Sequence, residues 1–569
     1  MPDPVQIASR AAQAEHLAAL AAVGMHPLLA RLYAARGVTS PQELATDLSG
    51  LVPLARLHNV ERMAAILADA IAARERLLII ADYDSDGATA CAVGMRALRE
   101  FGAVADYLVP NRFEFGYGLT PEIVELAKTV KNPDLLITVD NGIASIEGVA
   151  TANRLGMRVL ITDHHLPGTA LPDAQCIINP NQPECGFPSK NLAGVGVMFY
   201  LMLALRAELR KRGAFERERG PNLGALLDLV ALGTIADVVK LDANNRILVQ
   251  QGLQRIRAGK TWPGITALMR VGGRDPARAT TYDLGFVLGP RLNAAGRLDD
   301  MSVGIECLIS NDPATAERIA HELDALNRER RTIEADMHDN ALAALDELAP
   351  HDGYSLCLFD PNWHQGVIGI LASRIKDRLH RPVFAFARSG NAEIKGSGRS
   401  ISALHLRDAL DLVAKREPDL LSRFGGHAAA AGLTLREADL ERFRTAFEAT
   451  VQSLLTPADL KRIIATDGAL NAEHLTLDSA QLLEQQVWGQ GFPPPTFDDE
   501  FEVTRQRVVA DRHLKLRIAK DGVQYEAMLF SHAAPLPQRV HAVYRLAVNS
   551  YGGMHKLQLT IEHWEPLVE

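Results

Sequence analysis

Short, continuously apolar runs alternate with helical patterns in the part of the chain that follows residue 75. The runs at residues 77–80, 135–139 and 158–162 carry apolar side chains at nearly every position. Such runs are typical of parallel strands buried on both faces. The intervening residues 121–130 and 146–155 have a helical pattern. The alternation therefore predicts βαβ units built on a parallel sheet.

The pattern changes character elsewhere in the chain. Residues 1–70 are Ala-rich and helical in pattern, and residues 313–348 predict one long connector helix that begins at a proline. A second α/β region follows. After it, the alternating segments 513–518 and 556–561 favour half-exposed antiparallel strands of a small barrel or sandwich.

Composition limits the class of protein only broadly. A chain of 569 residues is too long for one core, and its 47% hydrophobic and 23% charged content is ordinary for a soluble protein. We expect a cytoplasmic protein without signal peptide or membrane span, whose five scattered cysteines are reduced thiols. The net charge of −9 leaves a nucleic-acid partner open, because a local basic groove can coexist with an acidic remainder.

Four acidic clusters follow apolar runs, and together they indicate the chemistry. They lie at residues 82–87, 139–142, 163–165 and 233–237. The first three follow predicted strands, and ligands of parallel sheets bind beyond the carboxyl ends of the strands. Carboxylates and an imidazole gathered at one rim are what a two-metal phosphoesterase requires.

The first cluster carries three carboxylates at alternating positions, Asp82, Asp84 and Asp86. In an extended chain they would face the same way and would repel one another unless protonated or bound to cations. Oxygen ligands favour Mg²⁺ or Mn²⁺, and an added imidazole favours Mn²⁺ or another transition-metal ion. The alternatives are a solvated acidic loop or a calcium loop of the EF-hand type, although Val93 stands where the latter needs a glutamate.

The other clusters supply an acid or an imidazole each. Asp140 could bridge two ions through its two oxygens, although the Asn-Gly that follows it is also an ordinary turn. In Asp163-His164-His165, one histidine could bind metal and the other could contact a substrate phosphate or a leaving oxygen. Asp237 is either the last ligand or the cap of a helix end.

Four loops combine glycine with arginine, asparagine or histidine, as phosphate-binding loops do. A turn that carries a surface arginine is the alternative for each. No Walker-type loop is present, and Gly194-Val195-Gly196 is too short to indicate a dinucleotide site. The four loops comprise residues 111–118, 289–297, 396–400 and 425–427.

The acidic clusters, in this order, resemble the four signature motifs of the DHH phosphoesterase superfamily, and Gly425-Gly426-His427 resembles the hallmark of its DHHA1 domain. The likeness is greatest to the branch of single-strand-specific 5′→3′ DNA exonucleases. Ser85 and the segment 489–493 depart from the usual pattern. The resemblance implies two α/β domains, DHH and DHHA1, joined by a long helix and followed by a C-terminal OB-like β-barrel. Its implied parts are a helical segment at 1–70, the DHH catalytic domain at 71–310, the connector at 311–350, DHHA1 at 351–452 and an OB-fold-like nucleic-acid-binding domain at 453–569.

The resemblance also implies roles for particular residues. His165 and Asp163 would be catalytic, with His165 facing the scissile phosphate or the leaving group. Asp82 would be a ligand or an acid that orients the ligands. The implied ligands of two Mn²⁺ or Mg²⁺ ions are Asp82, Asp84, Asp86, Asp140, His164 and Asp237. The implied substrate-binding residues are Arg112, Tyr117, Arg291, Asn293, Arg297, Ser397, Arg399, Gly425, Gly426 and His427.

The function implied by the resemblance is metal-dependent 5′→3′ hydrolysis of single-stranded DNA to 5′-mononucleotides, in recombination and repair. Single-stranded DNA, a single-strand-binding protein and a helicase are the implied partners. Two alternatives stay open. One is a DHH-family phosphodiesterase of short oligonucleotides or cyclic dinucleotides, against which the chain length and Lys515-Leu516-Arg517 argue. The other is an inactive nucleic-acid-binding scaffold, which would gain nothing from keeping the mutually repelling carboxylates.

Overall fold

The chain divides into two compact units. The computed structural model describes residues 5–111, 115, 118–215, 220–347, 353–390, 392–550 and 554–567. The larger unit contains residues 9–324 and 466–569, and the smaller contains residues 1–8 and 325–465. None of the helices in the described ranges is long and apolar enough to cross a bilayer.

A five-stranded parallel sheet forms the centre of one half of the larger unit. Its strand order is β3-β2-β4-β5-β6, and every neighbouring pair is parallel. The three predicted strands are confirmed as its middle. The sequence did not predict the edge strands, one of which is half-exposed and the other only three residues long. The strands are β2 (Arg76–Ala81), β3 (Val104–Leu108), β4 (Leu135–Val139), β5 (Arg158–Thr162) and β6 (Cys176–Ile178).

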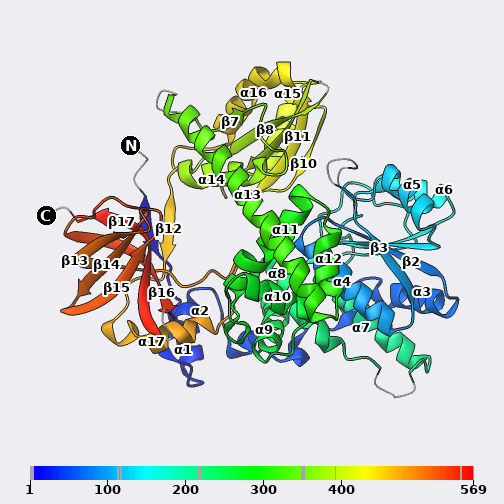
Figure 1. Cartoon of the computed structure of the whole chain (residues 1–569), viewed down its shortest axis with the longest axis horizontal. Helices are drawn as coiled ribbons and strands as arrows, with labels where there is room; N and C mark the ends of the chain where they lie inside the picture. The colour runs from blue at the N-terminus through cyan, green and yellow to red at the C-terminus, as the bar shows by residue number, and fades with distance from the viewer. Residues whose placement is uncertain are drawn as a thin grey trace. The chain divides into compact units, whose positions relative to one another are not determined.

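Helices cover both faces of this sheet, which explains why its strands are apolar throughout (Figure 1). On one face Leu78 and Ile80 pack in a core with the predicted helices, α5 (Pro121–Val130) and α6 (Ile146–Arg154). The other face is covered by α4 (Ser85–Glu100) and α7 (Gly194–Lys211). The sheet is therefore closed to water except at its rims.

The N-terminal region is helical except at its start. It contains α1 (Ala14–Ala21), α2 (Pro27–Ala34), α3 (Val60–Ala72) and three short 3₁₀ turns. The prediction of an entirely helical segment up to residue 70 is wrong at β1 (Gln6–Ser9), which pairs with β12 (Ile463–Thr466). A strand whose partner lies more than 450 residues away has no local signal in the sequence.

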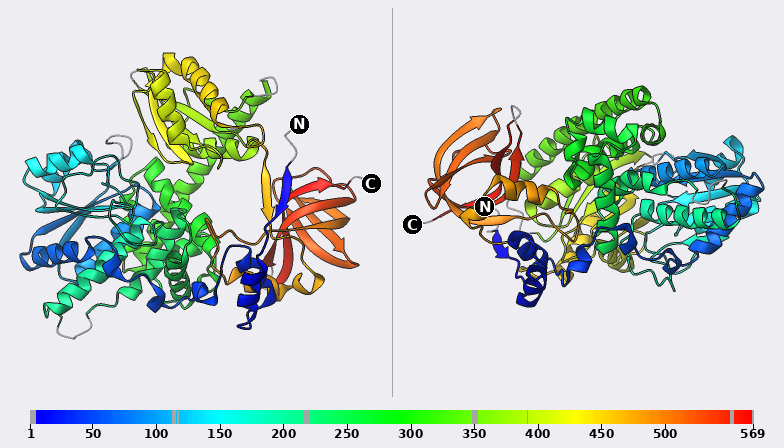
Figure 2. Two further views of the ribbon diagram at one scale, coloured as in Figure 1. Left: turned by 180° about the vertical axis from the view of Figure 1, so that it is seen from behind. Right: turned by 90° about the horizontal axis from the view of Figure 1, so that it is seen from below.

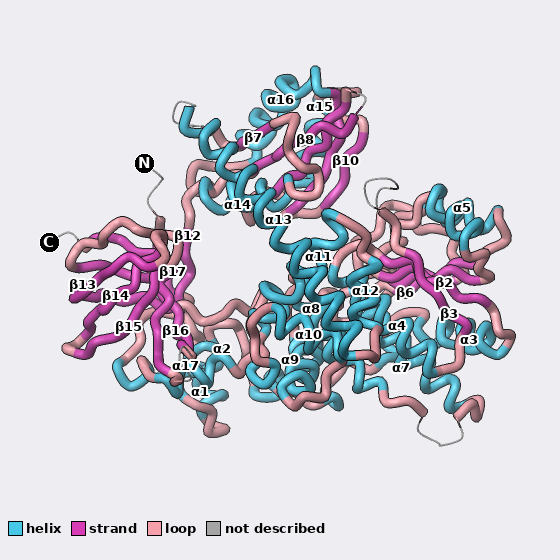
Figure 3. The backbone as a smooth tube through the Cα atoms, in the orientation of Figure 1, coloured by secondary structure: helices cyan, strands magenta, loops and turns pink. Residues whose placement is uncertain are grey.

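A helical layer follows the parallel sheet along the chain (Figure 3). Its third helix is followed by a π-helix at Asp283–Leu288, which runs directly into α11. π-Helices are rare and occur frequently at functional sites. The layer consists of α8 (Leu227–Ala236), α9 (Ala243–Arg257), α10 (Pro263–Val271), α11 (Gly289–Leu298) and α12 (Ser302–Ile309).

The C-terminal strands form a closed barrel in the order β13-β14-β15-β17-β16, so of the two predicted forms the barrel is confirmed (Figure 2). A helix, α17 (Leu477–Glu484), precedes it. A salt bridge of 2.9 Å between Arg36 and Asp467, both with side chains 1% exposed, ties this part to the N-terminal helices. The strands are β13 (Phe497–Val509), β14 (His513–Lys520), β15 (Val523–Leu529), β16 (Arg539–Asn549) and β17 (Lys556–Pro566).

The smaller unit contains a mixed five-stranded sheet of order β10-β11-β9-β8-β7. The predicted long helix is confirmed as α13 (Pro313–Glu347), and the chain passes from one unit to the other within it. Phe384 and Phe386 pack on one face of the sheet, while Val383 and Ala385 pack on the other. The remaining elements are β7 (Leu356–Phe359), α14 (Ile368–Leu379), β8 (Val383–Gly390), β9 (Glu393–Arg399), α15 (Leu406–Arg416), β10 (Arg423–Gly426), β11 (Ala430–Arg436) and α16 (Leu440–Leu454).

Candidate metal centre and active site

The acidic clusters converge at the carboxyl edge of the parallel sheet. Asp140 follows β4 directly, and its backbone N–H donates to the Thr162 carbonyl at the end of β5. Its φ of +62° is in the left-handed region, which aspartate tolerates better than most residues. Asp163 follows β5 in the same way. Parallel alignment of the strands thus delivers these side chains to one rim.

The carboxylates of the first cluster converge for a different reason from the predicted one. The expectation of an extended segment after β2 is wrong, because α4 begins at Ser85 and Asp84 is its N-cap. One oxygen of Asp84 accepts from the N–H groups of Asp86 and Gly87 at 2.9 and 3.1 Å. A Cβ on Gly87 would lie 2.4 Å from the Asp82 carbonyl oxygen, so glycine here permits a close approach.

The ligand atoms form overlapping groups in which all atoms lie within 4.8 Å of one another. Asp140 belongs to a group with Asp82 and Asp84, and also to a group with both histidines. His164 belongs in addition to a group with Asp86 and Asp237. Its Nε2 lies 3.0 Å from Asp140 Oδ1 and 3.5 Å from Asp237 Oδ2. This arrangement has room for two neighbouring cations with Asp140 between them.

Buried polar atoms in this centre fit a cation. Within the described ranges, His164 Nε2 and Asp237 Oδ2 are buried and make no hydrogen bond. Burial, together with the charges of neighbouring carboxylates, raises the pKa of Asp86 and of Asp237 to about 7. The same causes raise the pKa of Asp140. Carboxylates held this way take up either protons or metal ions.

His165 differs from its neighbour His164. Burial lowers the pKa of His164, as does the nearby His165. Burial also opposes the charge of His165, but its 2.8 Å contact with Asp163 and the surrounding carboxylates outweigh this and raise its pKa to about 9. Asp163 also accepts from three backbone N–H groups, those of Ile143, His164 and His165. Asp163 therefore orients His165 beside the ligands and favours its protonated form.

Two features of the centre were missed in the sequence. Gly194 and Val195 donate backbone N–H groups to Asp86 at 2.6 and 2.9 Å, and a Cβ on Gly194 would lie 2.7 Å from the Asp140 carboxylate. The Gly-x-Gly that opens a helix was the available signal. Asn179 and Asn181 donate to the carbonyls of His165 and His164 and so fix the histidine loop.

The predicted phosphate-binding residues of the larger unit lie on or near α11. Asn293 accepts from the N–H and hydroxyl of Ser85, so it joins α11 to the start of α4. Arg291 is buried and its guanidinium donates to Asp324 and to the Val287 carbonyl. Arg297 is half-buried in the last turn of α11. The predicted Arg112 and Tyr117 lie outside the described residues.

In the smaller unit the predicted residues lie on three adjacent antiparallel strands. Ser397 is opposite Gly432, which is opposite Gly425. The Arg399 guanidinium contacts the Ser397 hydroxyl at 3.3 Å, and Gly369, at the start of α14, leaves room for both side chains. Gly426 has a φ of +143° and leads to the exposed His427, whose N–H donates to the Ala430 carbonyl.

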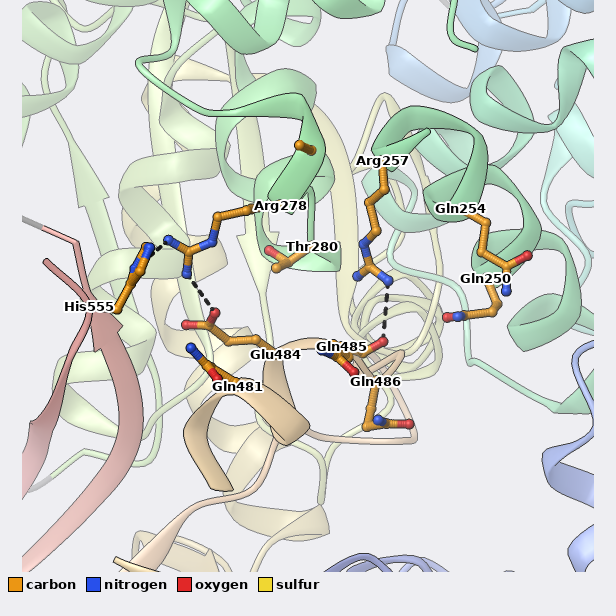
Figure 4. Close-up of a pocket in the computed structure, with 11 residues that line it drawn as sticks. Gln250, Gln254, Arg257, Arg278, Thr280, Gln481, Glu484, Gln485, Gln486 and His555 are labelled. Carbon is orange, nitrogen blue, oxygen red and sulfur yellow. Dashed lines mark hydrogen bonds and ion pairs between the residues drawn. The ribbon is translucent and has the colours of Figure 1, made fainter. Parts of the chain in front are cut away.

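A separate polar cavity of about 620 Å³ lies elsewhere in the larger unit and contains none of the candidate ligands (Figure 4). Arg278 crosses it and contacts Glu484 at 3.2 Å and His555 at 3.3 Å. Several glutamines line the remainder. The cavity thus lies where α17, the barrel and the helical layer meet.

Comparison with known proteins agrees with this architecture. Three family models match in order: "DHH family, N-terminal domain" at residues 76–234, "DHHA1 domain" at 352–453 and "RecJ OB domain" at 466–563. The single-stranded-DNA-specific exonuclease RecJ of Dickeya dadantii is 51% identical over 555 residues, which cover 95% of this chain and 96% of that protein. The chain belongs to the RecJ family. The protein of the same name from Escherichia coli K12 is 49% identical over 556 residues, again 95% of this chain and 96% of that one.

Solved structures of the RecJ family share the fold. A crystal structure of RecJ from Thermus thermophilus in complex with Mn²⁺ superposes with a TM-score of 0.82 at 30% identity, covering 100% of this chain and 81% of that chain. A complex of the same protein with Mg²⁺ gives a TM-score of 0.76 at 29% identity, covering 99% and 78%. The predicted fold, with DHH and DHHA1 domains, a long connecting helix and an OB barrel, is confirmed.

Proposed function

We propose that this chain is a single-stranded-DNA-specific exonuclease that uses two divalent ions, Mg²⁺ or Mn²⁺. The observation that carries the proposal is the convergence of ligand atoms from four separate segments, in overlapping groups of which two share Asp140. RecJ proteins about 50% identical over nearly the whole chain are named for this activity, and the Thermus structures hold these two ions.

Each candidate ligand has a place in the proposed centre. Asp86, His164 and Asp237 would hold one ion and Asp82 with Asp84 the other, while Asp140 would contact both. The bound ions would lower the pKa of a water and offset charge on the attacking and leaving oxygens. Regular secondary structure positions all six proposed ligands, which follow β2, β4 or β5, lie at the start of α4 or cap the end of α8.

The proposed role of His165 is to donate a hydrogen bond to the scissile phosphate or to the leaving oxygen. Asp163 contacts its Nδ1 at 2.8 Å and raises its pKa, which favours the protonated ring as a donor. A charged donor beside two cations stabilises negative charge that develops during hydrolysis. Asp163 acts through His165 and is a positioning residue.

The residues proposed to contact the substrate either bind phosphate or leave space for the strand. Arg297, Arg399 and Ser397 would hold phosphates, with Arg112 and Tyr117 as further candidates, and Gly425, Gly426 and His427 would let the strand approach the sheet edge. Asn293 would act by holding α11 against the first acidic cluster. Because Arg291 is paired with Asp324, phosphate binding there would have to compete with a salt bridge of 2.8 Å.

The decisive experiment replaces one ligand by its isosteric amide. Asp140→Asn keeps the side-chain shape, and asparagine tolerates the left-handed backbone. We expect loss of hydrolysis by at least about 10³-fold with folding intact, because the shared charge between the two ions is gone. Asp134→Asn is the matched control, since Asp134 stands at the other end of the same strand and pairs with Arg76 at the surface. Near-normal turnover by Asp140→Asn in either metal would refute the assignment.

The proposed direction is 5′→3′ with release of 5′-mononucleotides, in recombination and repair. Single strands and duplexes labelled at the 5′ or the 3′ end measure it directly. Immediate release of the 5′ label as mononucleotide from single strands alone is expected. Early release of the 3′ label would show that the polarity is 3′→5′ and would contradict the proposed direction. Rapid cleavage of a dinucleotide with slow cleavage of a long strand would instead favour an oligonucleotide phosphodiesterase.

We further propose a cytoplasmic setting with a single-strand-binding protein and a helicase as partners, since both would supply the unpaired strand. Pull-down of these two proteins by the intact chain, with and without single-stranded DNA, tests this. Failure to bind either in both conditions would remove the partners from the proposal.

A further inference from the structure

Two large aromatic side chains lie open to solvent beside the catalytic region. Tyr282 is 51% exposed and Phe286 is 66% exposed. Their rings stack with centroids 5.0 Å apart and an interplanar angle of 23°. Aromatic rings normally bury most of their area, so a stacked pair left in water indicates a surface that a ligand covers.

The segment that carries the pair packs against the end of α8, next to the candidate ligand Asp237. Phe286 lies on the π-helix Asp283–Leu288, next to Gly285. A Cβ on Gly285 would lie 3.1 Å from Ile235, and one on Gly289 would lie 3.1 Å from Ala236. The two glycines therefore allow a close approach to the last turn of α8, whose C-cap is the candidate ligand Asp237. The aromatic pair is therefore held on the same small framework as the centre.

A cation lies beside the pair. The Arg274 guanidinium is 5.6 Å from the centroid of the Tyr282 ring and 3.2 Å from Asp283. Its side chain is 46% exposed, so the face of the guanidinium that does not contact Asp283 can meet an anion. Exposed aromatic rings next to a guanidinium are the combination that binds unpaired bases and their phosphates without sequence preference.

We propose that Tyr282 and Phe286 form a stacking platform for a nucleobase of the single strand, with Arg274 contacting the adjoining phosphate. The platform would hold the strand near the rim of the sheet while the scissile bond occupies the metal centre. This deepens the proposed function, because it identifies where an unpaired base is recognised. A duplex cannot use the platform, since its bases already stack on one another.

The test compares substitutions that keep or remove the aromatic ring. Phe286→Leu keeps an apolar side chain and removes the π-face, while Phe286→Trp keeps the face. With oligo(dT) of 30 nucleotides, Phe286→Leu should raise KM on the order of fivefold to tenfold, with kcat within about twofold. Phe286→Trp should keep KM at the wild-type value. The matched control Val130→Ala shortens the side chain of a residue that is 59% exposed on α5, and it should change neither KM nor kcat.

A binding measurement separates this platform from the proposed activity. In the Asp140→Asn background the strand stays intact, and 2-aminopurine placed at successive positions reports stacking by its fluorescence. We expect quenching at one position when Tyr282 and Phe286 are both unchanged. Loss of this quenching in Phe286→Leu and its retention in Phe286→Trp would support the platform even if wild-type hydrolysis fails. Unchanged KM and unchanged quenching in a folded Phe286→Leu protein would overturn it. Equal losses with Leu and Trp would also overturn it, because the aromatic face would then not matter.

Discussion

The two α/β sheets of this chain gather polar residues in different ways. In the parallel sheet all strands end at one rim, so acids that follow different strands meet there and are buried. In the mixed sheet, Ser397, Gly432 and Gly425 meet by the register of antiparallel neighbours. The first arrangement holds negative groups in a dry, crowded place. The second presents serine, arginine and glycines along a more open surface.

This difference predicts different sensitivity to change. Burial makes each carboxylate of the rim dependent on its neighbours, so small steric or charge changes affect the whole centre. On the open sheet each side chain acts more independently, so a substitution costs only its own contacts. The following experiments test this contrast.

The largest contrast should come from adding one methyl group to each sheet's site. Gly194→Ala would place a Cβ 2.7 Å from the Asp140 carboxylate, so we expect about 1–3 kcal/mol of destabilisation and weakened metal binding. Gly432→Ala meets no atom closer than 3.8 Å and should be neutral or stabilising by up to about 1 kcal/mol. Thermal unfolding and Mn²⁺ titration measure both. Equal effects would erase the contrast.

The next effect concerns pH and metal removal. Burial and neighbouring charge raise the pKa of Asp86 and Asp237 to about 7, above an unfolded value of about 4. Their contribution to the stability of the metal-free protein is therefore fully present below pH about 4 and is lost as the pH rises through about 7. Bound ions replace these protons, so Mn²⁺ should raise the Tm much more at pH 8.5 than at pH 5.5. An equal rise at both values would contradict the coupling.

The smallest effect is expected on the open sheet. Arg399→Lys loses the planar guanidinium that contacts Ser397 and the Gly398 carbonyl. We expect KM for single-stranded DNA to rise about tenfold, on the order of 1.5 kcal/mol, with Mn²⁺ affinity unchanged. Arg388→Lys on the same sheet, which pairs with Glu437 at the surface, is the control. A lower Mn²⁺ affinity in Arg399→Lys would show that the two sites are not independent.

Much of the fold and of the candidate site could be predicted because both depend on local pattern. Apolar runs identified β2, β4 and β5, and the acids that directly follow them had to reach one rim. The helix expected before Asp237 is present. The extended path expected for Asp82 to Asp86 was wrong, because Asp84 caps a helix. Acids at alternating positions are compatible with a strand as well as with a helix start, so the local pattern did not distinguish the two.

The sequence by itself determined the order of elements and the set of acids at the carboxyl ends of the strands, since a parallel sheet aligns those ends whatever the details of packing. Only the tertiary structure decided which groups those acids meet. The N–H groups of Gly194 and Val195 that bind Asp86 come from more than 100 residues away. The stacked Tyr282 and Phe286 become a site only because Gly285 and Gly289 bring their helix against α8. Such contacts depend on the packing of distant segments, which no local pattern of residues encodes.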